Sequence, residues 1–356
     1  MKLSVISFTD NGEALARRVR TACRTQMETV LFTKKKGVPE ADSPFESVQD
    51  SLQDWAKGRM EEKDALLFIG ACGIAVRAIA PYVTDKLTDS PVLVADEQGR
   101  HVIPILSGHV GGANELALFL AEKLGADPVI TTATDLNGKF AADLFAKKNF
   151  LTIQNRNGIA KVAAKALRNE TVTVAVEAGH FADQERDRKA ALLQNVRLIP
   201  YPCKEPADVV VSAQKLSESC LLHLIPQEYV VGAGCRKGKK TEELERFLQE
   251  VLHQAGIQTE QVFCLASVDL KKEEAALIQW GRTHKKRFET FCAEELMKAE
   301  GDFTGSAFVE KTVGVDNVCE RAAILAAGEG GELVFKKTAR DGMTAAVAKR
   351  EWRVRF

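Results

Sequence analysis

The sequence of 356 residues contains no apolar run as long as the roughly 18 residues that a membrane-spanning helix needs. Its first apolar stretch is also too short for the core of a signal peptide. Lys and Arg together number 49, and so do Asp and Glu, which gives a formal net charge of zero. Domains that bind nucleic acid are normally strongly basic. We therefore expect a cytoplasmic protein that binds neither membranes nor nucleic acid, and in which any electrostatic attraction of a ligand is local.

The eight cysteines include no C-x-x-C pair and show no regular spacing. In a chain of this size without a secretory signal, reduced thiols are a better interpretation than disulfides or a zinc site. Hydrophobic residues make up 45% and charged residues 28%, which is ordinary for a globular protein. We find no internal repeat and no low-complexity segment, and we expect no protein-bound metal.

Strand-like apolar runs alternate with helix-period segments along almost the whole chain. Such alternation is typical of α/β proteins, in which helices cover mostly parallel sheets. The segment PVLVADEQGRHVIPIL departs from this pattern, because turn residues separate two alternating strands and predict a hairpin. We expect three α/β units, over residues 1–135, 136–226 and 227–356, the middle one having the weakest pattern.

The stretch LSGHVGGANELALFLAEKLG, from Leu106 to Gly125, places a histidine and two glycines before an apolar helix over Ala113–Leu124. Glycines at the helix start offer no side-chain cap, so the first helical amides need another partner, such as water, Asn114 or a bound anion. His109 could exchange protons at the same place. A tight turn with a solvated histidine is the alternative. The substrate-binding candidates here are Ser107, Gly108, Gly111, Gly112 and Asn114.

The segment FIGACGIAVRAIAP has the same design, since Gly70 and Gly73 form a turn between a strand and a helix that begins near Ile74. Arg77 lies about one turn into this helix and is a candidate for binding an anionic ligand. Cys72 is a candidate nucleophile, because a helix N-terminus lowers the pKa of a thiol. A small residue that simply packs in the turn is the alternative explanation.

A third strand end, TTATD, carries hydroxyl groups and a carboxylate. Thr132 is a candidate for substrate binding, and Asp135 is either a general base or the cap of the helix that follows. In an open parallel sheet, ligands bind beyond the carboxyl ends of the strands. We therefore expect the turns at 70–73 and 107–112 to face one crevice.

The segment GAGCRKGKK places cationic side chains at another turn between a strand and a helix. It matches neither G-x-x-x-x-G-K-[ST] nor G-x-G-x-x-G, so the sequence gives no support to nucleotide binding. Gly234, Arg236 and Lys237 are candidates for binding a polyanion, with carboxylates as suitable as phosphates. A solvated basic loop is the alternative. Thr241 is expected to cap the helix that follows.

Taken in order, these motifs resemble the CbiG family, the cobalt-precorrin-5A hydrolases of the oxygen-independent pathway to cobalamin (vitamin B12). The resemblance covers about residues 45–350, and LSGHVGGAN and GAGCRKG are its most specific parts. It implies hydrolytic opening of the ring A δ-lactone of a cobalt-bearing tetrapyrrole. The two-carbon fragment then leaves as acetaldehyde, giving cobalt-precorrin-5B.

The resemblance also implies that no cofactor is needed, because cobalt arrives with the substrate, and that neighbouring enzymes of the pathway are possible partners. His109, Asp135 and Cys72 are then the candidates for catalysis. Two other functions remain open at this stage: a carrier that binds a corrinoid intermediate without catalysis, and a nucleotide-dependent α/β enzyme.

Overall fold

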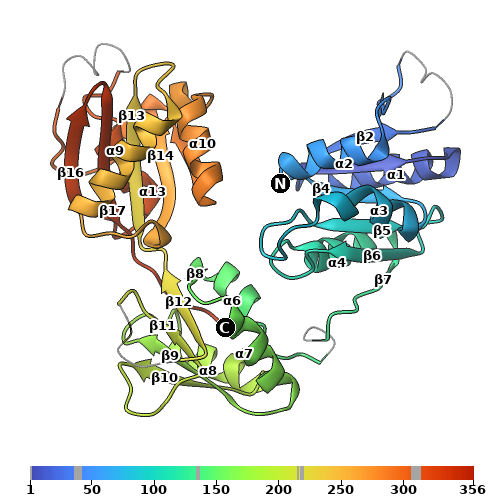
Figure 1. Ribbon diagram of the computed structural model, residues 1–356, viewed down its shortest axis with the longest axis horizontal. Coiled ribbons are helices and arrows are strands. Elements are labelled where there is room, and N and C mark those ends of the chain that lie inside the picture. Colours follow the sequence, from blue (N-terminus) through green and yellow to red (C-terminus); the bar gives the residue numbers. More distant parts are fainter. Residues whose placement is uncertain (1, 36–41, 134–136, 215, 217–219, 306–313) are drawn as a thin grey trace. The chain divides into compact units, whose positions relative to one another are not determined.

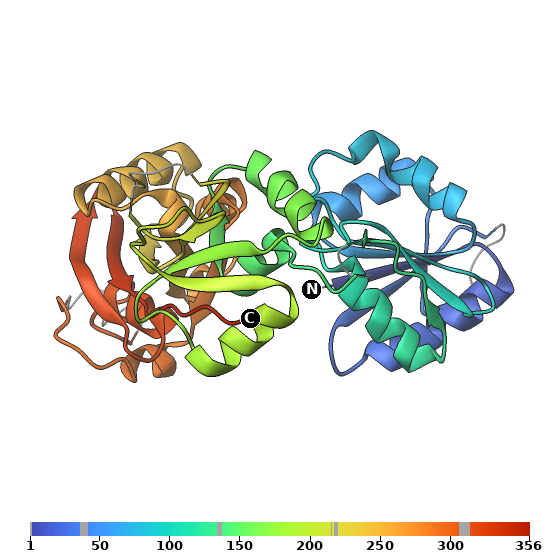
Figure 2. The same cartoon turned by 90° about the horizontal axis from the view of Figure 1, so that it is seen from below.

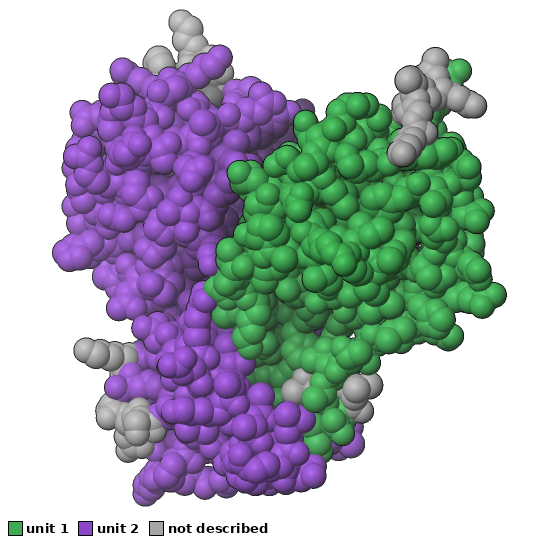
Figure 3. Space-filling view, turned by 45° about the vertical axis from the view of Figure 1, so that its right-hand side comes forward, with its two compact units in different colours: residues 1–144 green, residues 145–356 purple. Residues whose placement is uncertain are grey.

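The computed structural model describes residues 2–35, 42–133, 137–214, 216, 220–305 and 314–356. The chain forms two compact units, Met1–Leu144 and Phe145–Phe356, which Figure 3 shows in different colours. The first unit contains one sheet and the second contains two (Figure 1).

The sheet of the first unit has seven strands in the order β3-β2-β1-β4-β5-β6-β7. All neighbouring pairs are parallel except β5 and β6, which form the predicted hairpin. The strands are β1 (Lys2–Ser7), β2 (Glu28–Thr33), β3 (Phe45–Ser47), β4 (Ala65–Ile69), β5 (Val92–Ala95), β6 (His101–Leu106) and β7 (Asp127–Pro128).

Helices cover both faces of this sheet, as Figure 2 shows. On one face, α1 (Asp10–Cys23) and α4 (Ala113–Leu124) bury an apolar stripe against β1 and its neighbours. On the other face, α2 (Leu52–Glu61) and α3 (Cys72–Ile79), followed by η1 (Ala80–Tyr82), pack around Trp55 and Phe68. The short helix α6 (Ala142–Lys148) crosses the boundary between the units. Burial on both faces explains why the central strands are continuously apolar.

The direction of β6 decides where its following turn lies. Leu106, the last residue of β6, pairs with Val92, the first residue of β5, whereas Val102 pairs with Ala95 at the end of β5. The turn at 107–112 therefore lies at the amino-terminal edge of β4 and β5. This is the edge opposite to the one at which β4 ends.

The middle sheet of the chain, in the second unit, has the strand order β10-β9-β11-β12-β8, in which only β8 is antiparallel. Helix α7 contacts β9 and β12, and α8 contacts β10. The elements are β8 (Leu151–Ile153), α7 (Asn157–Leu167), β9 (Val172–Glu177), α8 (Gln184–Leu193), β10 (Val196–Tyr201), β11 (Val209–Val211) and β12 (Leu222–Pro226).

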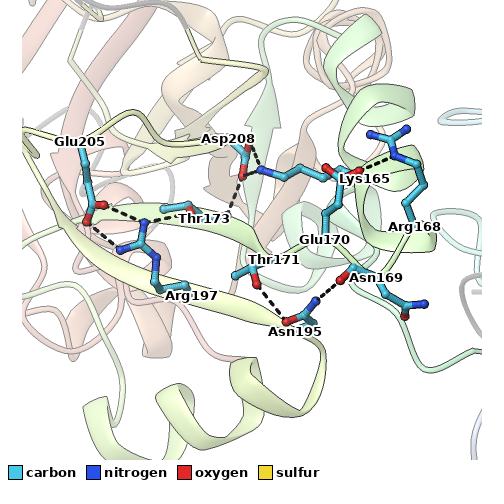
Figure 4. A network of polar contacts seen from close by, with 10 residues as sticks. All are labelled: Lys165, Arg168, Asn169, Glu170, Thr171, Thr173, Asn195, Arg197, Glu205 and Asp208. Atoms are coloured by element: carbon cyan, nitrogen blue, oxygen red, sulfur yellow. Dashed lines mark hydrogen bonds and ion pairs between the residues drawn. The ribbon is translucent and has the colours of Figure 1, made fainter.

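A polar network joins the amino-terminal ends of these strands (Figure 4). Lys165 donates to both carboxylate oxygens of Asp208, at 2.9 and 2.7 Å, and Asp208 also accepts from the amide of Thr173 at 2.8 Å. Beside it, Arg197 forms two parallel bonds with Glu205, at 2.9 and 2.7 Å. These groups satisfy one another's hydrogen bonds and charges. We therefore assign the network a structural role and not a role in binding a ligand.

The third sheet has the strand order β15-β14-β13-β17-β16. Helices α9 and α10 bury one face and α11 and α13 the other. The elements are β13 (Tyr229–Cys235), α9 (Thr241–Gln254), η2 (Thr259–Gln261), β14 (Val262–Val268), η3 (Asp269–Lys271), α10 (Ala275–His284), β15 (Arg287–Phe291), α11 (Ala293–Met297), α13 (Cys319–Ala327), β16 (Glu332–Arg340) and β17 (Met343–Lys349).

These observations confirm the predicted α/β class with mostly parallel sheets. One sheet falls within each of the ranges 1–135, 136–226 and 227–356, although the division into three domains stays a prediction. The predicted cap at Thr241 is wrong: α9 begins at Thr241 itself, Lys240 occupies the N-cap position, and no side chain caps the helix. Among the helices of the described ranges, none has the length and apolar character to cross a membrane.

The last residues of the chain return to the middle sheet. The amide of Arg355 donates to Asn149 Oδ1 at 2.7 Å, and Asn149 Nδ2 donates to the carbonyls of Arg355 and Phe145 at 3.1 and 2.9 Å. The ring of Phe356 packs 4.5 Å from that of Phe145. Asn149 is 7% exposed, so it anchors this tail from inside the unit.

We expect Asn149→Ala to lower the free energy of unfolding by about 1–3 kcal/mol, because it removes the two side-chain hydrogen bonds that hold the backbone of Arg355. Denaturant titration of the full chain measures this loss. The control Asn157→Ala, at an exposed position of α7, should change stability by less than about 0.5 kcal/mol. Equal effects from the two substitutions would contradict the anchoring role.

Candidate active site

The turn after β6 has a tightly interlocked backbone. Ser107 adopts a left-handed conformation with φ of 57°, which costs a residue with a side chain about 1–2 kcal/mol. A Cβ on Gly111 would lie 2.2 Å from Ser107 Cβ, and one on Gly108 would lie 2.7 Å from Asn114 Oδ1. Gly112 caps α4 with φ of 92°. The glycines are required because the chain folds back on itself here, and strained backbone of this kind is common at functional sites.

Of the partners considered for the first amides of α4, a bound anion is not needed by Ala113 or Asn114. The amide of Ala113 donates to the carbonyl of Ser107 at 3.1 Å, and the amide of Asn114 donates to that of Gly108 at 3.0 Å. The amide of Gly112 likewise donates to His109 O at 3.1 Å. The turn folds under the helix and supplies carbonyl acceptors, so the amides of Ala113 and Asn114 are not available to a ligand.

Three charged or ionisable side chains meet beside the turn. His109 Nδ1 lies 3.6 Å from Asp143 Oδ1, and Lys86 Nζ lies 3.9 Å from Asp143 Oδ2. The side chains of His109 and Asp143 are 15% and 9% exposed. Burial alone would raise the pKa of Asp143, but the contact with His109, the amide of Leu144 and the charge of Lys86 together lower it. Asp143 is therefore a carboxylate at neutral pH.

Three further polar side chains, those of Asn114, Thr132 and Ser107, lie at this edge of the sheet. Asn114, which is 7% exposed, donates from Nδ2 to Thr132 Oγ1 at 3.0 Å, so the predicted residues Asn114 and Thr132 come together. Ser107 is buried, and its Oγ has no hydrogen-bond partner within the described part of the chain. A buried hydroxyl without a partner is uncommon in native proteins. Asp135, predicted to be either a general base or a helix cap, lies outside the described residues.

The second predicted turn lies at the other edge of the sheet. The amide of Gly70 donates to the carbonyl of Ala95, the last residue of β5, at 2.8 Å. Arg77 Nη1 donates back to the carbonyl of Gly73 at 3.1 Å, and Cys72 opens α3 as a free, partly buried cysteine. The expectation of one crevice shared by 70–73 and 107–112 is therefore wrong, because β6 runs antiparallel to β5.

The loop that follows β13 belongs to the second unit. The amide of Arg236 donates to the carbonyl of Gly342 at 2.9 Å, and the amide of Gly238 donates to Glu274 Oε1 at 2.9 Å. These bonds fold the loop against its neighbours and leave the side chains of Arg236 and Lys237 exposed. Gly234 faces Thr344, whose Oγ1 would lie 2.9 Å from an added Cβ. The loop can thus present two cationic side chains to an anion.

Two family models match the chain, "Cobalamin synthesis G N-terminal" over residues 54–135 and "Cobalamin synthesis G C-terminus" over residues 229–348. The chain is 35% identical over 350 residues to the cobalt-precorrin-5A hydrolase of Salmonella typhimurium, covering 96% of both chains. The chain belongs to the CbiG family.

Two further similar proteins have lower sequence identity. The cobalt-precorrin-5A hydrolase of Priestia megaterium is 28% identical over 346 residues, which cover 94% of this chain and 92% of the relative. A solved structure, a homologue of cobalamin biosynthesis protein G from Sulfolobus solfataricus, is 22% identical and has a TM-score of 0.41. It covers 98% of this chain and 97% of its own.

In this member of the CbiG family, sequence reasoning missed Asp143 and Lys86. The segment FAADLFAKK contained a signal for the first of them, because Asp143 interrupts an otherwise apolar surface of α6, on which Ala142, Phe145 and Ala146 are buried. A carboxylate on a buried helix face requires a partner. In the described ranges, no group of three His, Cys, Asp or Glu side chains is placed to hold a metal ion.

Proposed function

We propose that this chain hydrolyses cobalt-precorrin-5A, the substrate named for its relatives in Salmonella typhimurium and Priestia megaterium. The observation that carries the proposal is 35% identity to an enzyme of that name over 96% of both chains. The site beside the turn at 107–112 supports it from within the molecule, since a partly buried imidazole next to a carboxylate suits proton transfer during hydrolysis.

In the proposed reaction, water adds to the carbonyl carbon of the ring A δ-lactone, and the ring carbon–oxygen bond breaks. The products of this step are a carboxylate and a hydroxyl group on the extruded two-carbon fragment. The hydroxyl proton then leaves while the carbon–carbon bond to the macrocycle breaks, releasing acetaldehyde. The electron pair stays with the macrocycle, which takes up a proton to give cobalt-precorrin-5B.

His109 is the group proposed to move these protons, first from the attacking water and then during release of the fragment. No redox step occurs, so the reaction as proposed uses no cofactor of the protein, and the cobalt belongs to the substrate. The acetate and propionate groups of the macrocycle suit exposed cations such as Arg236 and Lys237. We place the enzyme in the cytoplasm, where it would receive its substrate from, and pass its product to, other enzymes of the pathway.

The test is to mix the purified chain with cobalt-precorrin-5A under anaerobic conditions and measure acetaldehyde with a coupled dehydrogenase assay. We expect one acetaldehyde for each cobalt-precorrin-5B formed, over many turnovers. Tight binding of the tetrapyrrole without acetaldehyde would instead identify a carrier and overturn the proposal. A parallel reaction with the metal-free precorrin measures whether the enzyme needs the cobalt in its substrate.

A further inference from the structure

The side chains of His109 and Asp143 form an ion pair in which both partners are largely buried. Among the described residues of the first unit, Arg59 and Asp64 form a comparable pair, whereas others have an exposed partner, as between Arg59 and Glu62. Here the imidazole and the carboxylate are 15% and 9% exposed, with 3.6 Å between Nδ1 and Oδ1. Desolvation of two ionisable groups is costly unless they interact, so the pair requires an explanation.

We propose that Asp143 is a positioning residue that holds His109 through Nδ1 and so assigns proton transfer with the substrate to Nε2. The inference rests on the proposed function for the role of His109, and it adds a residue that the sequence motifs did not include. A neutral imidazole carries one proton, and a carboxylate beside Nδ1 stabilises the form with that proton on Nδ1. Nε2 is then the basic nitrogen.

Several features of the fold support this role for Asp143. The residue lies in the first turn of α6, where the amide of Leu144 donates to its Oδ1 at 3.0 Å and fixes the carboxylate. Lys86, from the loop before β5, lies 3.9 Å from the other carboxylate oxygen. The carboxylate is thus held from two sides, while its Oδ1 faces the imidazole.

The experiment uses the full chain with 15N-labelled histidine and the variant Asp143→Asn. Long-range 1H–15N spectra report which ring nitrogen of His109 carries the proton, and the His109→Gln spectrum assigns its signals. We expect the Nδ1-protonated form in the native protein at a pH where the ring is neutral, and a shift toward the Nε2-protonated form in Asp143→Asn. Turnover should fall at least about tenfold with little change in KM.

Asp64→Asn is the matched control, because Asp64 is another buried carboxylate of the first unit, 3% exposed, and contacts Ser4 and Arg59. It should leave the His109 signals and the turnover number unchanged, whatever it does to stability. An Nε2-protonated His109 in the native protein, or an unchanged form in Asp143→Asn, would overturn the positioning role. If the tautomer shifts as expected but His109→Gln keeps native turnover, the contact stands and the proposed role of His109 fails.

Discussion

Replacing His109 with glutamine is expected to lower the turnover number for acetaldehyde release by ~10²–10⁴-fold. Glutamine keeps much of the size and polarity of the side chain but cannot accept and return a proton near neutral pH. The substitution should leave the fold intact, because the backbone of the turn is held by hydrogen bonds between Ser107, Gly108 and the start of α4. Steady-state kinetics with cobalt-precorrin-5A measure the effect.

His101→Gln is the control for this prediction. His101 begins the same strand, β6, but its side chain is 50% exposed and it lies at the other edge of the sheet. We expect this variant to retain the native turnover number. Native activity in His109→Gln would rule out the proposed proton transfer, while the relationship to the CbiG family would stand.

Replacing Gly232 with alanine is expected to lower the free energy of unfolding by at least about 3 kcal/mol, or to prevent folding. A Cβ at this position of β13 would lie 1.8 Å from the carbonyl oxygen of Cys319 and 3.0 Å from Ala323 Cβ. Both residues belong to α13, which therefore packs directly on the strand backbone. The added methyl group can be accepted only if the whole helix moves.

Gly58→Ala is the matched control for Gly232→Ala. Gly58 lies inside α2, and nothing comes within 4 Å of the Cβ that alanine would add. Alanine has the higher helix propensity, so this variant should gain about 0.5–1 kcal/mol. Urea unfolding of both variants gives the comparison, and equal stability of Gly232→Ala and the native protein would show that α13 does not constrain the strand.

Local sequence patterns predicted the elements around the site well. The helix predicted over Ala113–Leu124 has those bounds in the structure, because apolar spacing and flanking glycines act within a few residues. The hairpin of β5 and β6 was also predicted. The expectation of one shared crevice was nevertheless wrong, because an antiparallel β6 carries the turn at 107–112 away from the carboxyl ends of β4 and β5. Strand direction thus decided which predicted residues share an edge.

The predicted site was correct in part. Asn114 and Thr132 meet as hydrogen-bond partners, and His109 belongs to the same turn as Ser107. The separation of Cys72 and Arg77 from this group was not predicted. The hydrogen bonds from the α4 amides to the carbonyls of the turn were not predicted either. They depend on how the turn folds beneath the helix and not on the type of residue at the helix start.

The residues alone determined the α/β class, the hairpin, the family and the importance of the turn after β6, because each depends on short-range spacing or on motifs that are contiguous in the chain. The tertiary structure decided that Asp143 stands between His109 and Lys86, that the turn at 70–73 lies elsewhere, and that Gly232 serves helix packing. Such contacts join residues that are distant in the sequence, and they exist only once sheet order and strand direction bring those residues together.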